Sequence, residues 1–188
     1  MPRDRRLIPE AGFLHVISRG NNRRKIFRYE RDLEEYYSIL LKSRAEDKVN
    51  ISHYCLMNNH IHLIVNVEED SNLSRFMKRV NLKYVYYYRR KYTYCGHLWQ
   101  DRFMSKIIDR EEYLIQCGKY IELNPVRADI VKQPEEYRFS SYLHYAFGVK
   151  DELIQDDPLY PYLGKTQELR QVRYKDMIIE EMIEERLR

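Results

Sequence analysis

The chain has 188 residues, of which 33 are lysine or arginine and 29 are aspartate or glutamate, so its formal net charge is +4. The length predicts one domain with a small extension. No apolar run approaches the roughly 20 residues of a membrane span, no apolar segment follows the charged N-terminus as in a secretory signal, and the three cysteines form no CxxC pair. We therefore expect a protein of the reducing cytoplasm without a disulfide framework.

The first half of the chain alternates between the apolar patterns of strands and helices. β-Branched and aromatic residues at alternating positions indicate strands, and apolar residues three or four apart indicate helices. These patterns predict strands over residues 12–19, 50–57 and 60–67, and helices over residues 31–46 and from about 71 to 92. Asn58 and Asn59 are expected to form a tight turn, and Asp70 or Ser71 can cap the second helix.

The second half adds a fourth strand and a third helix. Residues 102–108 predict the strand, and Asp109 with Glu112 forms a capping-box pattern for a helix that runs to about Leu123. Pro125 disfavours an α conformation at the residue before it. A short helix is expected to end near residue 147, and residues 166–188 are expected to be helical and charged.

The predicted order is β-α-β-β-α-β followed by a helix, which is the ferredoxin-like split βαβ arrangement of the α+β class. An antiparallel sheet of this kind carries both crossover helices on one face and leaves the other face open. We expect the third helix to lie across the open face. We also expect a domain over residues 1–150 and a charged, helical C-terminal tail over residues 151–188.

Two histidines lie two residues apart on the third predicted strand. Side chains at this spacing point to the same face, so His60 and His62 would lie side by side while Ile61, Leu63 and Val65 enter the core. Two neutral imidazoles can hold one divalent metal ion. Many strands carry two histidines by chance, so this pair alone favours a solvated or hydrogen-bonded pair over a metal site.

The third helix supplies two further polar side chains. Tyr120 and Asn124 are four residues apart and would lie on one face of that helix. If this face meets the histidines, Asn124 offers an oxygen as a third metal ligand and Tyr120 offers a phenol beside the metal. Two imidazoles and an amide oxygen suit Mg²⁺ or Mn²⁺. The set is suited to phosphodiester cleavage, in which the phenol attacks phosphorus.

Positive charge is concentrated in two parts of the chain. Residues 71–110 contain ten cations and only two anions, and the N-terminal segment is also basic. Such segregation indicates a phosphate-rich partner, although a solvated helix face is the competing interpretation. The 18 tyrosines could stack on unpaired bases or pack in half-buried positions.

Three motifs in order, MNNHIHLIV, GHLWQDRF and KYIELNPVRADIV, resemble the IS200-like Y1 transposases, and most closely the subfamily associated with repetitive extragenic palindromes. The resemblance covers roughly residues 10–147. The family comprises HUH single-strand DNA nucleases with a ferredoxin-like fold. It implies that His60 and His62 are the metal-binding pair, that Tyr120 is the nucleophile and that Asn124 completes the metal site. Asparagine replaces the glutamine found there in other subfamilies.

The resemblance also implies the remaining expectations. The reaction would be metal-dependent nicking and joining of hairpin or palindromic single-stranded DNA through a 5′-phosphotyrosine, with Mg²⁺ or Mn²⁺ and without a nucleotide cofactor. The protein would associate with the nucleoid as a monomer or homodimer. We expect the following DNA-contacting residues: Arg19, Arg23, Arg24, Lys25, Arg75, Lys78, Arg79, Lys83, Arg89, Arg90, Lys91, Trp99, Gln100 and Arg102.

Two alternatives remain. A domesticated relative could bind palindromic DNA or RNA without cutting it, and a metal-dependent phosphodiesterase could use water in place of the phenol. Among the other polar residues, Tyr113 is expected to be core or groove, while His15, His53, His97 and His144 are expected to be structural. Asn59 could brace His60.

Overall fold

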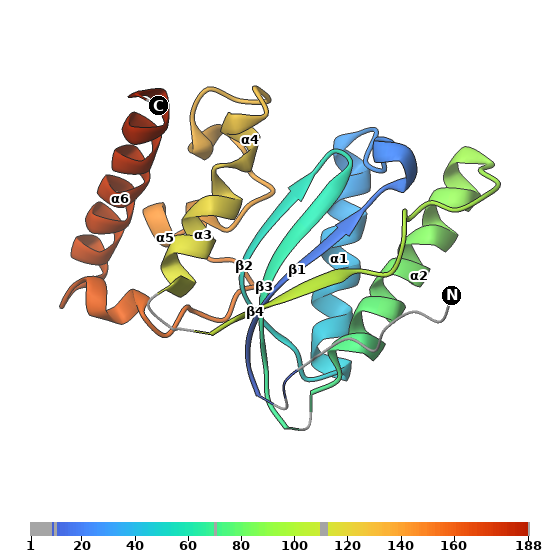
Figure 1. The fold of residues 1–188 in the computed structure, drawn as a ribbon, viewed down its shortest axis with the longest axis horizontal. Helices are drawn as coiled ribbons and strands as arrows, with labels where there is room; N and C mark the ends of the chain where they lie inside the picture. The colour runs from blue at the N-terminus through green and yellow to red at the C-terminus, as the bar shows by residue number, and fades with distance from the viewer. Residues whose placement is uncertain (1–8, 10, 70, 110–112, 188) are drawn as a thin grey trace.

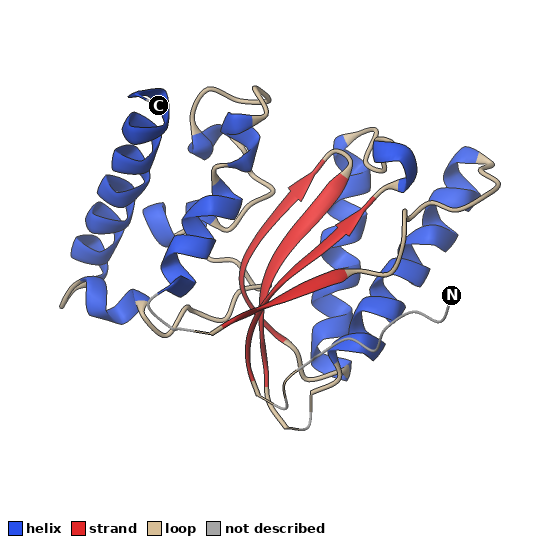
Figure 2. Ribbon diagram, in the orientation of Figure 1, coloured by secondary structure: helices blue, strands red, loops and turns tan. Residues whose placement is uncertain are grey.

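A four-stranded antiparallel sheet lies at the centre of the protein in the computed structural model, which describes residues 9, 11–69, 71–109 and 113–187. Its strands are β1 (Gly12–Arg19), β2 (Asn50–Met57), β3 (His60–Val67) and β4 (Met104–Ile108), in the order β2-β3-β1-β4. The elements follow one another as predicted, and together with this strand order they confirm the ferredoxin-like α+β fold (Figures 1 and 2).

Two long helices cover one face of the sheet. They are α1 (Glu30–Glu46) and α2 (Leu73–Tyr92), and Figure 1 shows both on the same side. Leu14 and Val16 of β1 and Ile61, Leu63 and Val65 of β3 are completely buried. The strand period of two therefore directs the apolar residues of β3 into this core, as predicted, and leaves the histidine positions for the opposite face.

Three helices lie on the opposite side of the sheet. They are α3 (Leu114–Glu122), α5 (Tyr142–Phe147) and α6 (Gln167–Leu187), and α4 (Asn124–Arg127) continues directly from α3. Helix α3 packs on β2 and β3. Its other side joins α5 and α6 in a second core that contains Ile115, Leu123, Tyr174 and Ile178. The open face of the sheet is thus partly covered, and α3 lies between the sheet and α6.

Short helical turns complete the chain at η1 (Asn21–Arg23), η3 (Pro134–Glu136) and η4 (Tyr160–Leu163). The outer edge of β2 is also occupied, since Leu56 donates its backbone N–H to the carbonyl of Phe139 and Ser141 donates to Tyr54. No described helix combines the length and the apolar composition that a membrane span requires.

Several predicted boundaries differ from the structure. Helix α2 is capped by Asn72, whose side chain accepts from the backbone N–H of Arg75, so the expectation of Ser71 is wrong, and Asp70 lies outside the described residues. Glu112 of the predicted capping box is outside them too. The chain remains helical at Asn124 because Pro125 lies within the first turn of α4, where a proline needs no hydrogen-bonded N–H.

Candidate active site

The two histidines predicted to bind metal lie at the start of β3, on the face opposite α1 and α2. In the sheet register His60 pairs with Arg19 and His62 with Ile17 of β1. Their ring centroids are 4.8 Å apart and the rings are nearly perpendicular. The side chain of His62 is buried, and that of His60 is half-buried beside the turn at Asn58 and Asn59. The strand pattern thus places both rings together, as expected from the spacing.

A third histidine joins this pair from the neighbouring strand. The Nε2 atom of His15 lies 2.8 Å from Nδ1 of His62, and the two rings stack with centroids 5.1 Å apart. His15 was expected to be merely structural. One sequence does not reveal the cross-strand register that brings residue 15 beside residue 62, although alternation in β1 does place His15 on the same face as Arg19.

The hydrogen bonds of the rings determine which nitrogens can bind a metal. Nδ1 of His60 lies 2.5 Å from Oδ1 of Asn59, so it carries the proton and leaves a lone pair on Nε2. Nδ1 of His62 is occupied by His15. Both pair members therefore direct Nε2 away from their hydrogen-bond partners, an arrangement typical of metal-binding histidines whose second nitrogen is held.

Burial keeps these histidines neutral. It lowers the pKa of His60 to about 4, with a further contribution from Arg19, and that of His62 to about 2. Burial and Lys106 lower the pKa of His15 to about 4. Neutral imidazole is the form that binds a metal ion.

The predicted third ligand has an unsatisfied amide. The side-chain nitrogen of Asn124 is buried and has no hydrogen-bond partner. The two ends of an amide are assigned from their surroundings, so a reversed amide would present an oxygen at this position, and a cation would satisfy that oxygen. Histidine, cysteine and acidic side chains alone form no group of three ligands within the described ranges. In the chemistry of their donor atoms, the residues present fit a site of two imidazoles and an amide oxygen.

Tyr120 lies on α3 with about half of its side chain exposed, at 51%. Its ring faces the guanidinium of Arg127, whose carbon is 4.7 Å from the ring centroid. Helix α3 brings Tyr120, and α4 brings Asn124, to the histidine side of the sheet, but among the described contacts neither side chain touches a histidine. Their convergence on His60 and His62 stays a prediction.

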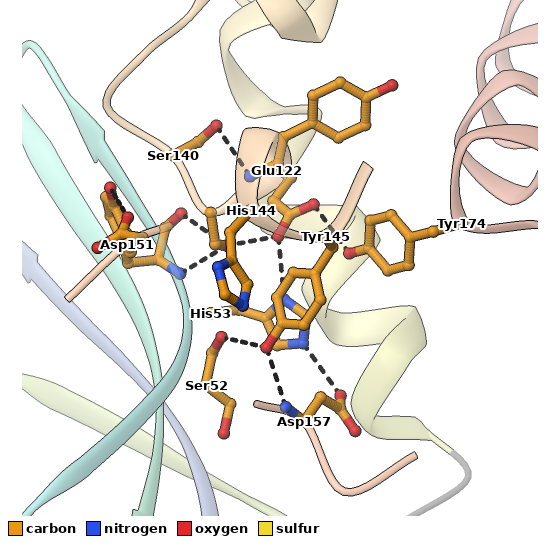
Figure 3. A network of polar contacts seen from close by, with 12 residues as sticks. Ser52, His53, Glu122, Ser140, His144, Tyr145, Asp151, Asp157 and Tyr174 are labelled. Atoms are coloured by element: carbon orange, nitrogen blue, oxygen red, sulfur yellow. Dashed lines mark hydrogen bonds and ion pairs between the residues drawn. The ribbon is translucent and has the colours of Figure 1, made fainter. Parts of the chain in front are cut away.

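A buried polar network fixes α3 against the sheet (Figure 3). His53 of β2 lies between Glu122 of α3 and Asp157, with both ring nitrogens 3.0 Å from a carboxylate oxygen. Tyr174 of α6 donates to Glu122 at 2.8 Å. Burial alone would lower the pKa of His53, but the hydrogen bonds and charges of Asp157 and Glu122 raise it to about 9.

Close approach of the backbone of α3 requires a glycine above this histidine. A Cβ at Gly118 would lie 2.5 Å from the ring of His53. The interpretation of His53 as structural agrees with its complete burial. His53 and Gly118 together fix the position of the helix that carries Tyr120 on the sheet.

The predicted DNA-contacting residues fall into two separate groups. Arg19, Gln100 and Arg102 line a hollow between β1, β4 and the segment before β4, on the histidine face. The loop at residues 20–25 adjoins the same corner, because Gly20 donates its N–H to the carbonyl of Asn59 and the side chain of Asn59 donates to the carbonyl of Arg23. Arg19 and the basic loop thus lie beside the end of β3 that carries His60.

The second group lies on α2, behind the sheet. Arg75 and Arg79 bind the buried carboxylate of Asp47, and Lys83 lies 3.4 Å from Glu46. Lys91 contacts Asp32 at 2.7 Å. Trp99 is half-buried against Tyr36 and Tyr84, so much of its indole is committed to packing. Roles of these residues in DNA binding stay predictions.

Comparison with known proteins agrees with this architecture. The family described as "Transposase IS200 like" matches residues 11–124. A REP-associated tyrosine transposase solved bound to a REP hairpin has a TM-score of 0.66 at 21% identity, over 84% of this chain and 93% of that chain. This likeness shows a shared fold.

Two weaker likenesses carry no argument about function. One is to a putative transposase from Deinococcus radiodurans R1, with a TM-score of 0.45 at 15% identity over 65% of this chain and 96% of that chain. The other is to a bacterial tRNA(His) guanylyltransferase-like protein in complex with GTP, with a TM-score of 0.49 at 14% identity over 65% and 66%. No curated protein matches the chain. Since the family match spans well over half of the sequence, the chain belongs to the IS200-like transposase family.

Proposed function

We propose that this transposase is a metal-dependent single-strand DNA endonuclease and strand transferase that acts on hairpin or palindromic DNA. The observation that carries the proposal is the shared face of the sheet. It presents two neutral histidines whose Nδ1 atoms are held by hydrogen bonds, and it is the face on which the helix of Tyr120 packs. The hairpin held by the REP-associated relative supports the choice of substrate.

His60, His62 and Asn124 would hold the divalent ion, Mg²⁺ or Mn²⁺. When bound, such an ion polarises a phosphate oxygen and compensates the charge that develops in the transition state. Nδ1 of His60 stays bound to Asn59, which holds the ring in the ligating tautomer. The basic corner around residues 19–25 would hold the phosphates of the strand.

Tyr120 performs the covalent step. Its phenolic oxygen attacks the scissile phosphorus as the phenol loses its proton, and the bond from phosphorus to the 3′ oxygen breaks. The released 3′ oxygen takes up a proton, and the 5′ phosphate stays on Tyr120. Attack by another 3′-OH on the phosphotyrosine reverses these bond changes and joins the strands, so no external energy source is required.

The test is transfer of labelled DNA to the protein. A hairpin with a single-stranded flank is labelled at its 3′ end, because the downstream strand stays on the tyrosine. The wild type with Mn²⁺ should give a labelled adduct that resists SDS and maps to Tyr120. Tyr120→Phe should form none while binding the hairpin normally, since only a hydroxyl is lost.

Two controls identify the cause of inactivity. Tyr113→Phe, at the start of the same helix, should form the adduct like the wild type. His60→Ala should lose both the adduct and Mn²⁺ binding, whereas Tyr120→Phe should retain Mn²⁺ binding. An adduct in Tyr120→Phe would place the nucleophile elsewhere. Tight hairpin binding by the wild type without cleavage would favour the non-cleaving alternative, and cleavage without an adduct would favour a water nucleophile.

A further inference from the structure

Arg127 contacts Tyr120 through both its ring and its backbone carbonyl. Besides stacking on the phenol ring at 4.7 Å, its guanidinium donates a hydrogen bond of 2.5 Å to the backbone carbonyl of Tyr120. One side chain therefore contacts both the ring and the backbone of the proposed nucleophile. A cation over an aromatic face is attractive and favours the ring orientation that keeps the contact.

Helix α6 in turn fixes Arg127. Nε of Arg127 lies 2.9 and 3.0 Å from the two carboxylate oxygens of Glu185, and its Nη2 atom also contacts Glu185. Glu181 lies 3.9 Å from the same guanidinium and 3.3 Å from Nζ of Lys119 on α3. An arginine bound at several points in this way is rigid, because the planar fork matches a carboxylate.

These contacts form a continuous connection from the C-terminal helix to the phenol. Glu185 holds Arg127, and Arg127 holds Tyr120. The bond from Tyr174 to Glu122 keeps α6 against the helix that bears the tyrosine. Arg127 and α6 lie beyond residues 11–124, where the family match ends.

We propose that Arg127, held by Glu185, is a positioning residue that sets the orientation of the Tyr120 ring for attack. The proposal rests on the proposed role of Tyr120 as nucleophile. A half-exposed phenol has several rotamers, and each rotamer that points away from the scissile phosphate slows the covalent step. Orientation of reacting groups is worth large rate factors, and a misplacement of about 1 Å can cost about 100-fold.

The experiment measures the single-turnover rate of adduct formation together with hairpin affinity and thermal stability. Arg127→Met keeps the stem and removes the cation. It should slow the adduct about 10-fold to 100-fold while hairpin affinity stays near that of the wild type. Glu185→Gln keeps Arg127 but loosens it, and should slow the adduct less. Glu180→Gln on the exposed side of α6 is the matched control and should react like the wild type.

An exchanged pair separates positioning from a purely structural ion pair. Arg127→Glu with Glu185→Arg can restore attraction between α4 and α6, but it leaves no cation over the ring. We expect recovered stability with an adduct rate that stays low. Recovery of the full rate would overturn the proposal, as would a normal rate in Arg127→Met.

A spectroscopic measurement reports on the Tyr120 ring itself, and it remains informative if Arg127→Met folds poorly. With 3-fluorotyrosine at position 120, the ¹⁹F resonance of the free protein should shift in Glu185→Gln, which keeps both helices intact, and should stay unchanged in Glu180→Gln. An unchanged resonance in Glu185→Gln would overturn the connection through Arg127. A wild type that forms no adduct on Tyr120 would instead overturn the proposed function, so the two failures are distinct.

Discussion

The orientation of each histidine in the proposed metal pair depends on a single hydrogen bond to its Nδ1 atom. For His60 the partner is its own neighbour, Asn59, and for His62 it is His15 on the adjacent strand. Partners of this kind determine the tautomer and the direction of the free nitrogen, so they affect metal affinity without touching the metal.

We therefore expect His15→Ala to weaken Mn²⁺ binding about 10-fold to 100-fold, the usual cost of losing such a partner. Calorimetric titration with Mn²⁺ in the absence of DNA measures this directly. His144→Ala is the control, because that histidine binds Asp156 far along the chain and should leave Mn²⁺ affinity unchanged. Equal affinities in His15→Ala and the wild type would show that His62 keeps its orientation unaided.

At the scale of single residues, some positions in the proposed site could be predicted from the sequence and others could not. The period of a strand is local, so the common face of His60 and His62 followed from their spacing. His15 is 47 residues from His62, and its contact depends on the register between β1 and β3. No role was predicted for Arg127, because an arginine shortly after Pro125 gives no local indication of the group on which its guanidinium stacks.

At the scale of elements, the two groups of cations lie in different electrostatic surroundings. On α2, Arg75, Arg79 and Lys83 face acidic groups at the C-terminal end of α1, including the buried Asp47, and Lys91 faces Asp32. The cations of the loop at residues 20–25 lie beside the turn at Asn58 and Asn59 that precedes His60. Phosphates approaching the proposed site would meet the loop first, and paired cations offer less attraction.

We expect Arg23→Gln with Lys25→Gln to weaken hairpin binding and to make its dependence on salt shallower. The slope should fall by roughly 0.7 for each phosphate of a single strand that the variant no longer neutralises. Lys78→Gln with Lys83→Gln removes the same charge from α2 and should change both quantities less. Fluorescence anisotropy at several salt concentrations gives the slopes. A larger effect of the α2 pair would move the DNA to the far face of the sheet.

Most element boundaries were predictable because apolar periodicity is local. The strands over 12–19, 50–57 and 60–67 agree with the structure. The cap of α2 was misplaced because Asp70, Ser71 and Asn72 are all good capping residues, and the backbone geometry selects among them. The covering of α3 by α6 depends on tertiary packing that helical patterns do not specify.

At the scale of the whole molecule, His53 links the sheet, α3 and the segment before η4. The groups that contact it are Glu122 on α3, Asp157 in that segment and Tyr145 on α5, and Tyr174 of α6 donates to Glu122. Burial raises the pKa of both tyrosines well above their usual range, so they stay neutral. A protonated His53 between two carboxylates stabilises the fold, and its neutral form gives up that attraction.

The sign of the pH dependence follows from the raised pKa of His53. Its stabilising contribution is complete below the unfolded value of 6.5 and is lost as pH rises through about 9. The free energy of unfolding in urea should therefore fall between pH 6.5 and pH 9 in the wild type. The fall should be smaller in His53→Gln, which is less stable at pH 6.5. Parallel curves for the two proteins would show that His53 is neutral throughout.

The network around His53 also has a consequence for synthesis. Strands β1 to β4 and helices α1 and α2 are complete by residue 108. The partner of His53, Asp157, and the partner of Glu122, Tyr174, are synthesised only later. Domains made on the ribosome fold as their parts emerge. The helix of Tyr120 should therefore dock only after most of α6 has left the exit tunnel. A nascent chain would form its sheet before it acquired the proposed cleavage activity. Arrested chains of increasing length, assayed for the labelled adduct, should become active only once α6 is exposed.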